Sequence, residues 1–402
     1  MRKTPKNPLS RRVFIKTGIG GMAFAVFPHV FLDNSRLTGT EDFLGRLLRG
    51  KYAGQRGGIE VVIRDETLFA GIRKPIKERR ELEPRIAVLK KACAGKTAGP
   101  LTHIFRFDTP VEGYDSEIGF PVSAEVSTGD IKTHKLRKMH FYSLLQNKAI
   151  EKLSESSGKL YQYMSKTGLS PELELVEIYE DYNPDRKAVQ KIQVMAAFLA
   201  WPEVYREQLE RVLGKGAADE VWRDGEKITP HTLVDERCAW VGETIDRLKA
   251  RTTVGQQFDI LSRVALIRPS EDVMKYKAMY DKNKDINTVF RAQEEQLKET
   301  PTGGYVDPPH FDGKILHVSK VPYNGKAYME AKTHREKRKA YCFCNLVREA
   351  EDPKIDPIFC YRAAGWARQF WEPILGVEFK KCLITHSILK GDNFCAWDYY
   401  LE

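Results

Sequence analysis

The cysteines near the C-terminus are the residues whose type and spacing most directly suggest chemistry. Five of the seven lie within 54 positions, at Cys342, Cys344, Cys360, Cys382 and Cys395. On one face of a predicted strand, Cys342 and Cys344 would stand about 7 Å apart, close enough to share a metal if the strand bends. With Cys360, and with Cys395 or His386 as a fourth ligand, they predict a four-coordinate site for zinc or iron, since thiolates suit those ions.

Three other roles for these thiols stay open at the level of the sequence. An oxidising destination would favour one or two disulfides, and apolar surroundings would favour separate, unreactive thiols. A catalytic thiolate would need an activating histidine. This part of the chain offers His317, His334 and His386, but no recognisable motif links them to a cysteine.

The elements that must position such groups belong to a chain of 402 residues, enough for two to three domains. Hydrophobic residues make up 42% and are spread along the chain, which excludes disordered, collagen-like and polytopic membrane proteins. Half of the formal charge of +10 belongs to residues 1–35, and the rest is dispersed without a long basic block. The sequence therefore predicts no nucleic-acid partner.

The first 35 residues combine a basic start with an uncharged stretch. The motif Ser10-Arg-Arg-Val-Phe-Ile-Lys16 precedes residues 17–32, which carry no formal charge and include three glycines. This order resembles a twin-arginine export signal, and 16 uncharged residues are too few for an ordinary membrane span. The resemblance implies export of a folded protein through the twin-arginine machinery, to the periplasm or beyond. No Ala-x-Ala cleavage site is evident near Leu32, so an uncleaved segment could hold the protein at the membrane. The alternative is an N-terminal core helix with a chance arginine pair.

Residues 58–201 have the pattern of a duplicated unit. Strands are predicted at 59–64, 67–72, 102–107, 116–123, 135–144, 173–179 and 189–199, with helices at 82–92 and 150–164. Equivalent positions of the two copies are 71 to 74 residues apart in the sequence. Leu101 and Leu173, for example, are 72 residues apart. The nearly constant offset predicts an internal duplication of a β-α-β-β unit.

Three short motifs in this region carry a resemblance to a known family. They are Gly119-Phe-Pro-Val-Ser123, Phe141-Tyr-Ser-Leu144 and Val176-Glu-Ile-Tyr179. Together they resemble the gyrase-inhibitor-like small-molecule-binding domain, which also supplies effector-binding modules of some transcription activators. The resemblance implies two units side by side, with a ligand cleft along the line between their sheets. Many members carry a glycine before the second helix where this chain has His140-Phe141, so that loop is expected to differ.

Glu177 is the carboxylate expected in such a cleft. It lies on a predicted strand between Val176 and Ile178, whose side chains point to the other face. Burial would raise its pKa, so that it could bind a cation or act as a general base. The alternative is an ordinary solvent-facing glutamate. The candidate aromatic walls of the cleft are Tyr142, Tyr161 and Trp201, against which a flat and partly cationic ligand would stack. The alternative is that these three rings simply pack in the core.

The remainder of the chain divides into a helical bridge at 202–300 and a cysteine-rich module at 301–402. Charges that alternate in sign predict that the bridge helices form a layer packed on the C-terminal module. That module is expected to contain strands at 315–321 and 340–344, a helix at 362–375, and a hairpin with arms at 378–389 and 394–401.

Further motifs occur in the cysteine-rich module, namely Tyr341-Cys-Phe-Cys344, Trp371-Glu-Pro-Ile-Leu-Gly376 and Lys390-Gly-Asp-Asn-Phe-Cys395. They resemble hydrocarbon-binding domains of the vinyl-4-reductase type and the L-2-amino-thiazoline-4-carboxylic acid hydrolase-like group. The resemblance implies an α+β ligand-binding fold in which the cysteines could hold a metal. Related chains often carry a second Cys-x-Cys where Arg362 stands here, which removes a potential ligand.

The sequence thus predicts an α+β protein with a duplicated β-α-β-β ligand-binding module, a helical bridge and a C-terminal α+β cysteine-rich module. Its expected role is an exported small-molecule-binding protein with two fused modules for apolar, aromatic or cationic organic ligands. The alternative is a periplasmic hydrolase, in which Glu177 acts as general base or a cysteine-bound metal activates water. No catalytic triad, phosphate loop, dinucleotide fingerprint or helix-turn-helix is recognised.

Overall fold

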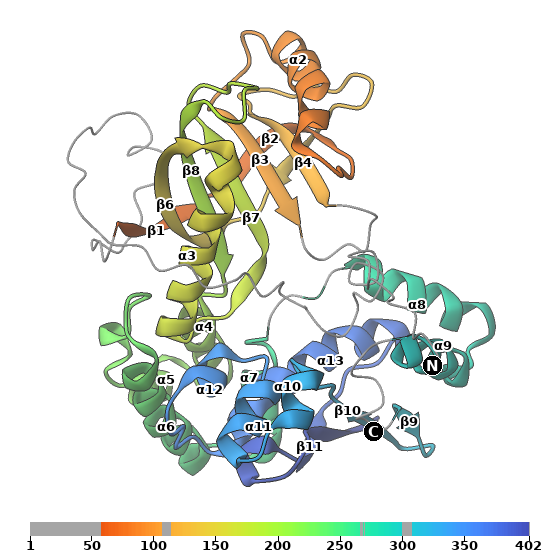
Figure 1. Cartoon of the computed structure of the whole chain (residues 1–402). Helices are drawn as coiled ribbons and strands as arrows, with labels where there is room; N and C mark the ends of the chain where they lie inside the picture. The colour runs from red at the N-terminus through yellow and green to blue at the C-terminus, as the bar shows by residue number, and fades with distance from the viewer. Residues whose placement is uncertain (1–57, 107–113, 266–267, 269, 300–307, 402) are drawn as a thin grey trace, which may run out of the picture.

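The computed structural model describes residues 58–106, 114–265, 268, 270–299 and 308–401. The predicted export signal lies outside these residues. Within them the protein has the expected α+β architecture, with a large sheet at one end and a helical body with a small sheet at the other (Figure 1). None of the described helices is long and apolar enough to cross a membrane.

The large sheet has eight antiparallel strands in the order β1-β6-β8-β7-β3-β4-β2-β5. Their bounds are Ile59–Arg64 (β1), Thr67–Arg73 (β2), Leu101–Arg106 (β3), Asp115–Pro121 (β4), Lys132–Leu136 (β5), Met139–Ala149 (β6), Pro171–Tyr179 (β7) and Val189–Phe198 (β8). Two helices belong to this region, α2 (Leu82–Ala92) and α3 (Leu153–Thr167). Each follows a short 3-10 turn, η2 (Arg79–Glu81) and η3 (Ile150–Lys152) respectively.

The strand order confirms the predicted duplication. β3 and β7 pair at the centre, and the outward order β3-β4-β2 on one side repeats as β7-β8-β6 on the other. The halves also exchange their leading strands, because β1 pairs with β6 and β5 pairs with β2. One expectation was wrong: the segment predicted as a single strand at 135–144 belongs to two strands, β5 and β6. The polar, mostly exposed sequence of β5 hides it from a search for alternating apolar residues.

The helical body begins directly after β8. Its bridge helices are α4 (Trp201–Leu213), α5 (Lys215–Trp222), α6 (Val234–Arg251), α7 (Val254–Ser262), α8 (Ser270–Asn283) and α9 (Ile286–Glu299), with the turn η4 (Gly225–Lys227) after α5. Helices α7 and α8 pack against α13 (Tyr361–Leu375) of the C-terminal region. The approach to α7 is close, since a Cβ atom at Gly365 would overlap the carbonyl oxygen of Ser262.

The C-terminal region adds a four-stranded antiparallel sheet in the order β11-β12-β10-β9. Its other elements are β9 (His310–Phe311), β10 (Ile315–Ser319), α10 (Gly325–Glu330), α11 (His334–Tyr341), α12 (Asn345–Glu349), η6 (Pro357–Cys360), β11 (Lys381–His386), η7 (Ile388–Lys390) and β12 (Ala396–Tyr400). The predicted hairpin is confirmed by the pairing of β11 with β12. The predicted strand at 340–344 is wrong. Thr333 and Glu336 form a capping box that starts α11, and Cys342 and Cys344 flank the turn between α11 and α12.

The two ends of the molecule share one hydrophobic core. Helix α3 ends at Gly168, which has φ +69° and lies so close to α6 and α12 that a Cβ atom would come within 2.8 Å of Val234. The buried guanidinium of Arg237 on α6 donates to the carbonyl oxygen of Thr167 at 2.8 Å. Asn345 on α12 likewise donates to the carbonyl oxygen of Leu169 at 2.8 Å. These bonds satisfy backbone groups at the end of α3 and fix the large sheet against the helical body.

Candidate functional site

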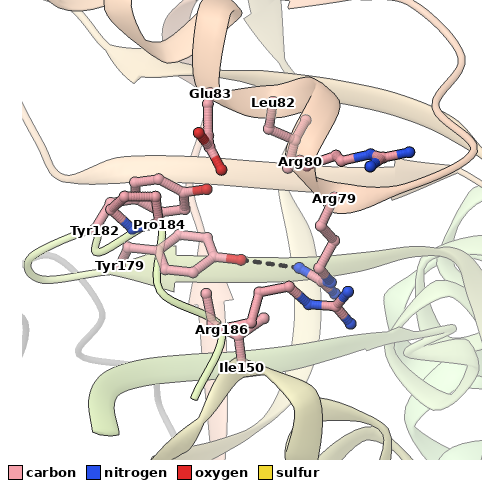
Figure 2. Close-up of a pocket in the computed structure, with 9 residues that line it drawn as sticks. All are labelled: Arg79, Arg80, Leu82, Glu83, Ile150, Tyr179, Tyr182, Pro184 and Arg186. Carbon is pink, nitrogen blue, oxygen red and sulfur yellow. Dashed lines mark hydrogen bonds between the residues drawn. The ribbon is translucent and has the colours of Figure 1, made fainter. Parts of the chain in front are cut away.

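A groove lies where the two halves of the large sheet meet, on the face that carries α2 (Figure 2). The first half contributes η2 and the start of α2, and the second half contributes η3, the end of β7 and the turn that follows it. The residues that line it are Arg79, Arg80, Leu82, Glu83, Ile150, Tyr179, Tyr182, Pro184 and Arg186. This is the place where the resemblance to gyrase-inhibitor-like domains implied a cleft.

A buried ion pair forms the inner wall of the groove. Glu177 on β7 has a side chain that is 1% exposed, and its two carboxylate oxygens accept from the two terminal nitrogens of Arg79, each at 2.5 Å. The hydroxyl of Tyr179 accepts from Arg79 at 3.0 Å (Figure 2). It donates to Glu177 at 2.6 Å. Arg79 is therefore held in the two-pronged geometry that makes arginine–carboxylate pairs strong.

An aromatic ring completes the surroundings of Arg79. Its guanidinium carbon lies 5.1 Å from the centre of the Phe105 ring, within the range of a cation–π interaction. Phe105 comes from β3, the partner of β7, and Arg79 comes from η2 just before α2. The chain thus supplies its own planar cation to a site that has one carboxylate and one ring.

Arg79 changes the expected acid–base behaviour of Glu177. Burial acts to raise the pKa of this carboxyl, but the attraction of Arg79 and the hydrogen bonds from Arg79 and His103 outweigh it, so the pKa is lowered. The predicted rise in pKa was wrong, because the sequence did not reveal the partner. A carboxylate held in this way is a poor general base at neutral pH.

His103 extends the buried network to β4. Its Nδ1 atom lies 3.4 Å from Glu177, and its Nε2 atom lies 2.7 Å from the hydroxyl of Ser116. Burial lowers the pKa of His103 more than the neighbouring carboxylate raises it. His103 is therefore a neutral side chain that lies beside Glu177 and is hydrogen-bonded to Ser116.

The groove is small as it stands. Its free volume is about 10 Å³, about the space of one water molecule. The side chain of Arg79 is 24% exposed and separates Glu177 from the solvent. An organic ligand that reaches the carboxylate must therefore displace Arg79 outward.

The three predicted aromatic walls lie elsewhere. Tyr142 is fully buried under α3, where its hydroxyl donates to the carbonyl oxygen of Pro230 and lies 3.1 Å from the hydroxyl oxygen of Thr167. Tyr161 packs at the edge of the same core. Trp201 starts α4 and contacts the rings of Trp240, Tyr205 and Phe359 in the helical body. None of the three is among the described residues that line the groove.

The four predicted metal ligands come from four different places around the α11–α12 turn, but they do not fit a metal site. Cys344 Sγ accepts from a guanidinium nitrogen of Arg362 at 3.6 Å, and Cys360 Sγ lies 3.6 Å from the hydroxyl of Ser387. Burial raises the pKa of Cys342, and raises that of Cys360 to about 12. All seven cysteines are free, and the described residues include no group of three or more arranged to hold a metal ion. The structure therefore gives the zinc or iron site no support.

Sequence reasoning missed Arg79, His103 and Phe105. The alternation of β3 contains a signal, since His103 and Phe105 are two apart and so share a face. Arg79 gives no such signal, because it stands among other charged residues before α2 and its partner is 98 positions away.

Comparisons with known proteins do not show a family for this chain. No protein-family model matches it, and no curated protein sequence matches it. EcmrR in a complex with DNA is 14% identical over 35% of this chain, with a TM-score of 0.31, and this chain spans 56% of that one. SAV2435 bound to tetraphenylphosphonium is 10% identical over 36% of this chain and 96% of that one, with a TM-score of 0.26. A hydrolase from Listeria innocua is 12% identical over 37% of this chain and 94% of that one, with a TM-score of 0.28. Likenesses at this level assign no ligand and no activity to this chain.

Proposed function

We propose that the groove between the two halves of the large sheet binds a small, planar, positively charged organic molecule. The observation that carries the proposal is the setting of Arg79, a planar cation over the ring of Phe105 and bound at both nitrogens to buried Glu177. A ligand with a delocalised cation offers the same two interactions. It binds when Arg79 moves out to the solvent.

The exchange is energetically balanced because one cation replaces another. Glu177 left alone would be an uncompensated buried charge, which costs about 3–5 kcal/mol. A cationic ligand removes this cost and adds contact with the rings of Tyr179 and Tyr182, which pack edge to face at 5.3 Å. Arg79 is tethered to the site and so competes with the ligand at a high effective concentration. We expect modest affinity in the natural protein for this reason.

Titration with proflavine, a flat fluorescent cation, tests the proposal. Arg79→Ala removes the competitor and is expected to raise the affinity for proflavine. Glu177→Gln removes the charged hydrogen bond and is expected to lower it by roughly 1.5–3 kcal/mol, about tenfold or more. Arg335→Ala is the control, because this arginine on α11 is 48% exposed, pairs with Glu351 and does not line the groove.

Two results would overturn the proposal. One is equal binding of proflavine by the natural protein and by the Arg79→Ala and Glu177→Gln variants. The other is a preference for 2-anthroate, a flat anion, that is lost in Arg79→Ala, because this would make the arginine itself the ligand-binding group. Unfolding midpoints of each variant, with and without dye, show whether a change in binding reflects loss of the fold.

We place this binding activity outside the cytoplasm, on the ground of the twin-arginine motif at Ser10–Lys16. The hydrolase alternative has less to support it, since Glu177 is engaged by Arg79 and the cysteines do not form a metal site among the described residues. Binding without turnover is therefore the function that this geometry favours.

A further inference from the structure

A second cleft lies on the four-stranded sheet. This sheet is at the end of the molecule opposite the large sheet (Figure 1). Its volume is about 260 Å³, enough for a molecule of one or two rings. It shares no lining residue with the groove. Aromatic and imidazole rings dominate its wall, and those on which the argument depends are His310, His317, His386 and Phe394.

The rings form two stacked pairs that stand on different strands. His310 on β9 stacks on His317 on β10, with ring centres 4.4 Å apart and planes 20° apart. His386 at the end of β11 stacks on Phe394 with the same 4.4 Å separation and 22° between planes. Within each pair the two ring planes are nearly parallel, so each pair presents a flat surface.

Small residues lie between the strands that carry the two pairs. Ala396 on β12 is directly opposite His386 on one side and Ser319 on the other. Paired residues of an antiparallel sheet point to the same face, so His386, Ala396 and Ser319 share the face on which the cleft opens. Ala396 and Ser319 leave room there that larger side chains would fill.

Several polar groups of the cleft can donate a hydrogen bond. The one carboxylate, Asp398, already accepts from His317 Nδ1 at 2.7 Å, and Asp312 lies 3.6 Å from the other nitrogen of that ring. The hydroxyls of Ser319 and Thr385 also line the wall. A ligand that brings acceptor oxygens would suit this set of donors.

We infer that this cleft is a second ligand site, which takes a planar aromatic molecule of one or two rings with a carboxylate or carbonyl oxygen. The ring of the ligand lies over Ala396 and Ser319, against the stacked faces, and its oxygen meets the donors. Asp398 orients the imidazole of His317 and is a positioning residue. The inference uses no residue of the groove and does not depend on the function proposed there.

Calorimetric titration of the full chain with 2-naphthoate tests the inference. The natural protein should bind this ligand more tightly than cyclohexanecarboxylate, which has the carboxylate but no flat ring, and than 2-naphthylmethylammonium, which has the ring but a cation. Phe394→Ala removes half of one ring pair, and Ala396→Leu fills the space in the middle. Each should weaken binding of 2-naphthoate by about tenfold. Met329→Ala, at an exposed side chain outside the cleft, should leave it unchanged.

Histidine resonances give a readout that needs no variant. On addition of 2-naphthoate to the natural protein, the imidazole signals of His317 and His386 should shift, while those of His103 should not. No binding at millimolar concentration would overturn the inference, as would binding that leaves these signals and both cleft variants unaffected. Equal binding of the naphthyl cation would overturn the requirement for an acceptor oxygen.

Discussion

Replacing Arg79 with alanine is the sharpest perturbation of the buried network. The change leaves Glu177 with a charge, a 1% exposed side chain and only the hydroxyl of Tyr179 and the imidazole of His103 nearby. Removing one partner of a buried pair costs about 3–5 kcal/mol. Since the Arg79 side chain is 24% exposed, water can enter after its removal, and we expect the lower end of that range. A loss of about 3 kcal/mol should lower the unfolding midpoint of a chain of this size by roughly 4 °C.

The stability of Arg79→Ala should be partly restored by a small molecule that replaces the missing part of the side chain. Ethylguanidinium has the atoms that alanine removes from Arg79, so it can pair with Glu177 and lie on Phe105. Thermal unfolding with about 10 mM ethylguanidinium, too dilute to act as a denaturant, should restore part of the lost midpoint in Arg79→Ala. No gain is expected in the natural protein, in Arg335→Ala or in the double variant Arg79→Ala with Glu177→Gln.

The pH dependence has a definite sign. In the natural protein the pKa of Glu177 is lowered on folding, so its contribution to stability is present above the unfolded value near 4.3 and is lost as the pH falls below it. Without Arg79, burial is expected to raise that pKa instead, and the folded variant then gains stability as the pH falls through the raised value. The difference in unfolding free energy between the natural protein and Arg79→Ala should therefore become smaller from pH 7 to pH 5. A difference that is constant with pH, together with no rescue by ethylguanidinium, would refute the reasoning about the ion pair.

Three further predictions concern other parts of the chain. Gly365→Ala should destabilise the protein strongly, because its Cβ atom would overlap the carbonyl oxygen of Ser262. Gly216→Ala on α5 should be neutral or stabilising, because its Cβ atom meets no atom within 4 Å. Thermal unfolding compares the two variants, and equal midpoints would contradict the packing of α13 on α7. Changing Arg11 and Arg12 together to lysine should keep the protein in the cytoplasm, as measured by fractionation, and an unchanged periplasmic yield would show that the motif is not an export signal. Protein made in a reducing cytoplasm should show seven free thiols after denaturation and no bound metal by elemental analysis, so near-stoichiometric zinc or iron would contradict the environment described for Cys344 and Cys360.

Local patterns predicted the secondary structure where burial follows the period of the element. The bounds of β1 and α2 agree with the expectation because their apolar residues alternate or recur with helical spacing. The hairpin of β11 and β12 was also predictable from its Lys390-Gly-Asp-Asn393 turn. The turn between Cys342 and Cys344 was not, since the spacing of two thiols says nothing about the capped helix before them.

The candidate site was predictable only in part, because it is made of contacts between distant segments. Glu177 was found from its strand pattern, but its pairing with Arg79 depends on how η2 lies over the junction of β3 and β7. Trp201 was expected in the cleft, yet the start of α4 directs it into the helical body, where Phe359 packs against it. Tertiary context decides such cases, and no local pattern in one sequence contains it.

The two halves of the large sheet are related by an internal two-fold symmetry in fold, but their residues differ at the groove. By the offset of 72 positions, the place of Glu177 in the second half corresponds to Phe105 in the first, and the place of His103 corresponds to Leu175. A homodimer of identical half-length chains would carry the same residue at both places, so two carboxylates or two rings would occur together. Fusion of the copies in one polypeptide lets them diverge, and each can supply what the other lacks. A molecule bound in the groove would therefore have a single orientation, with its charge toward the second copy and its flat face over the first.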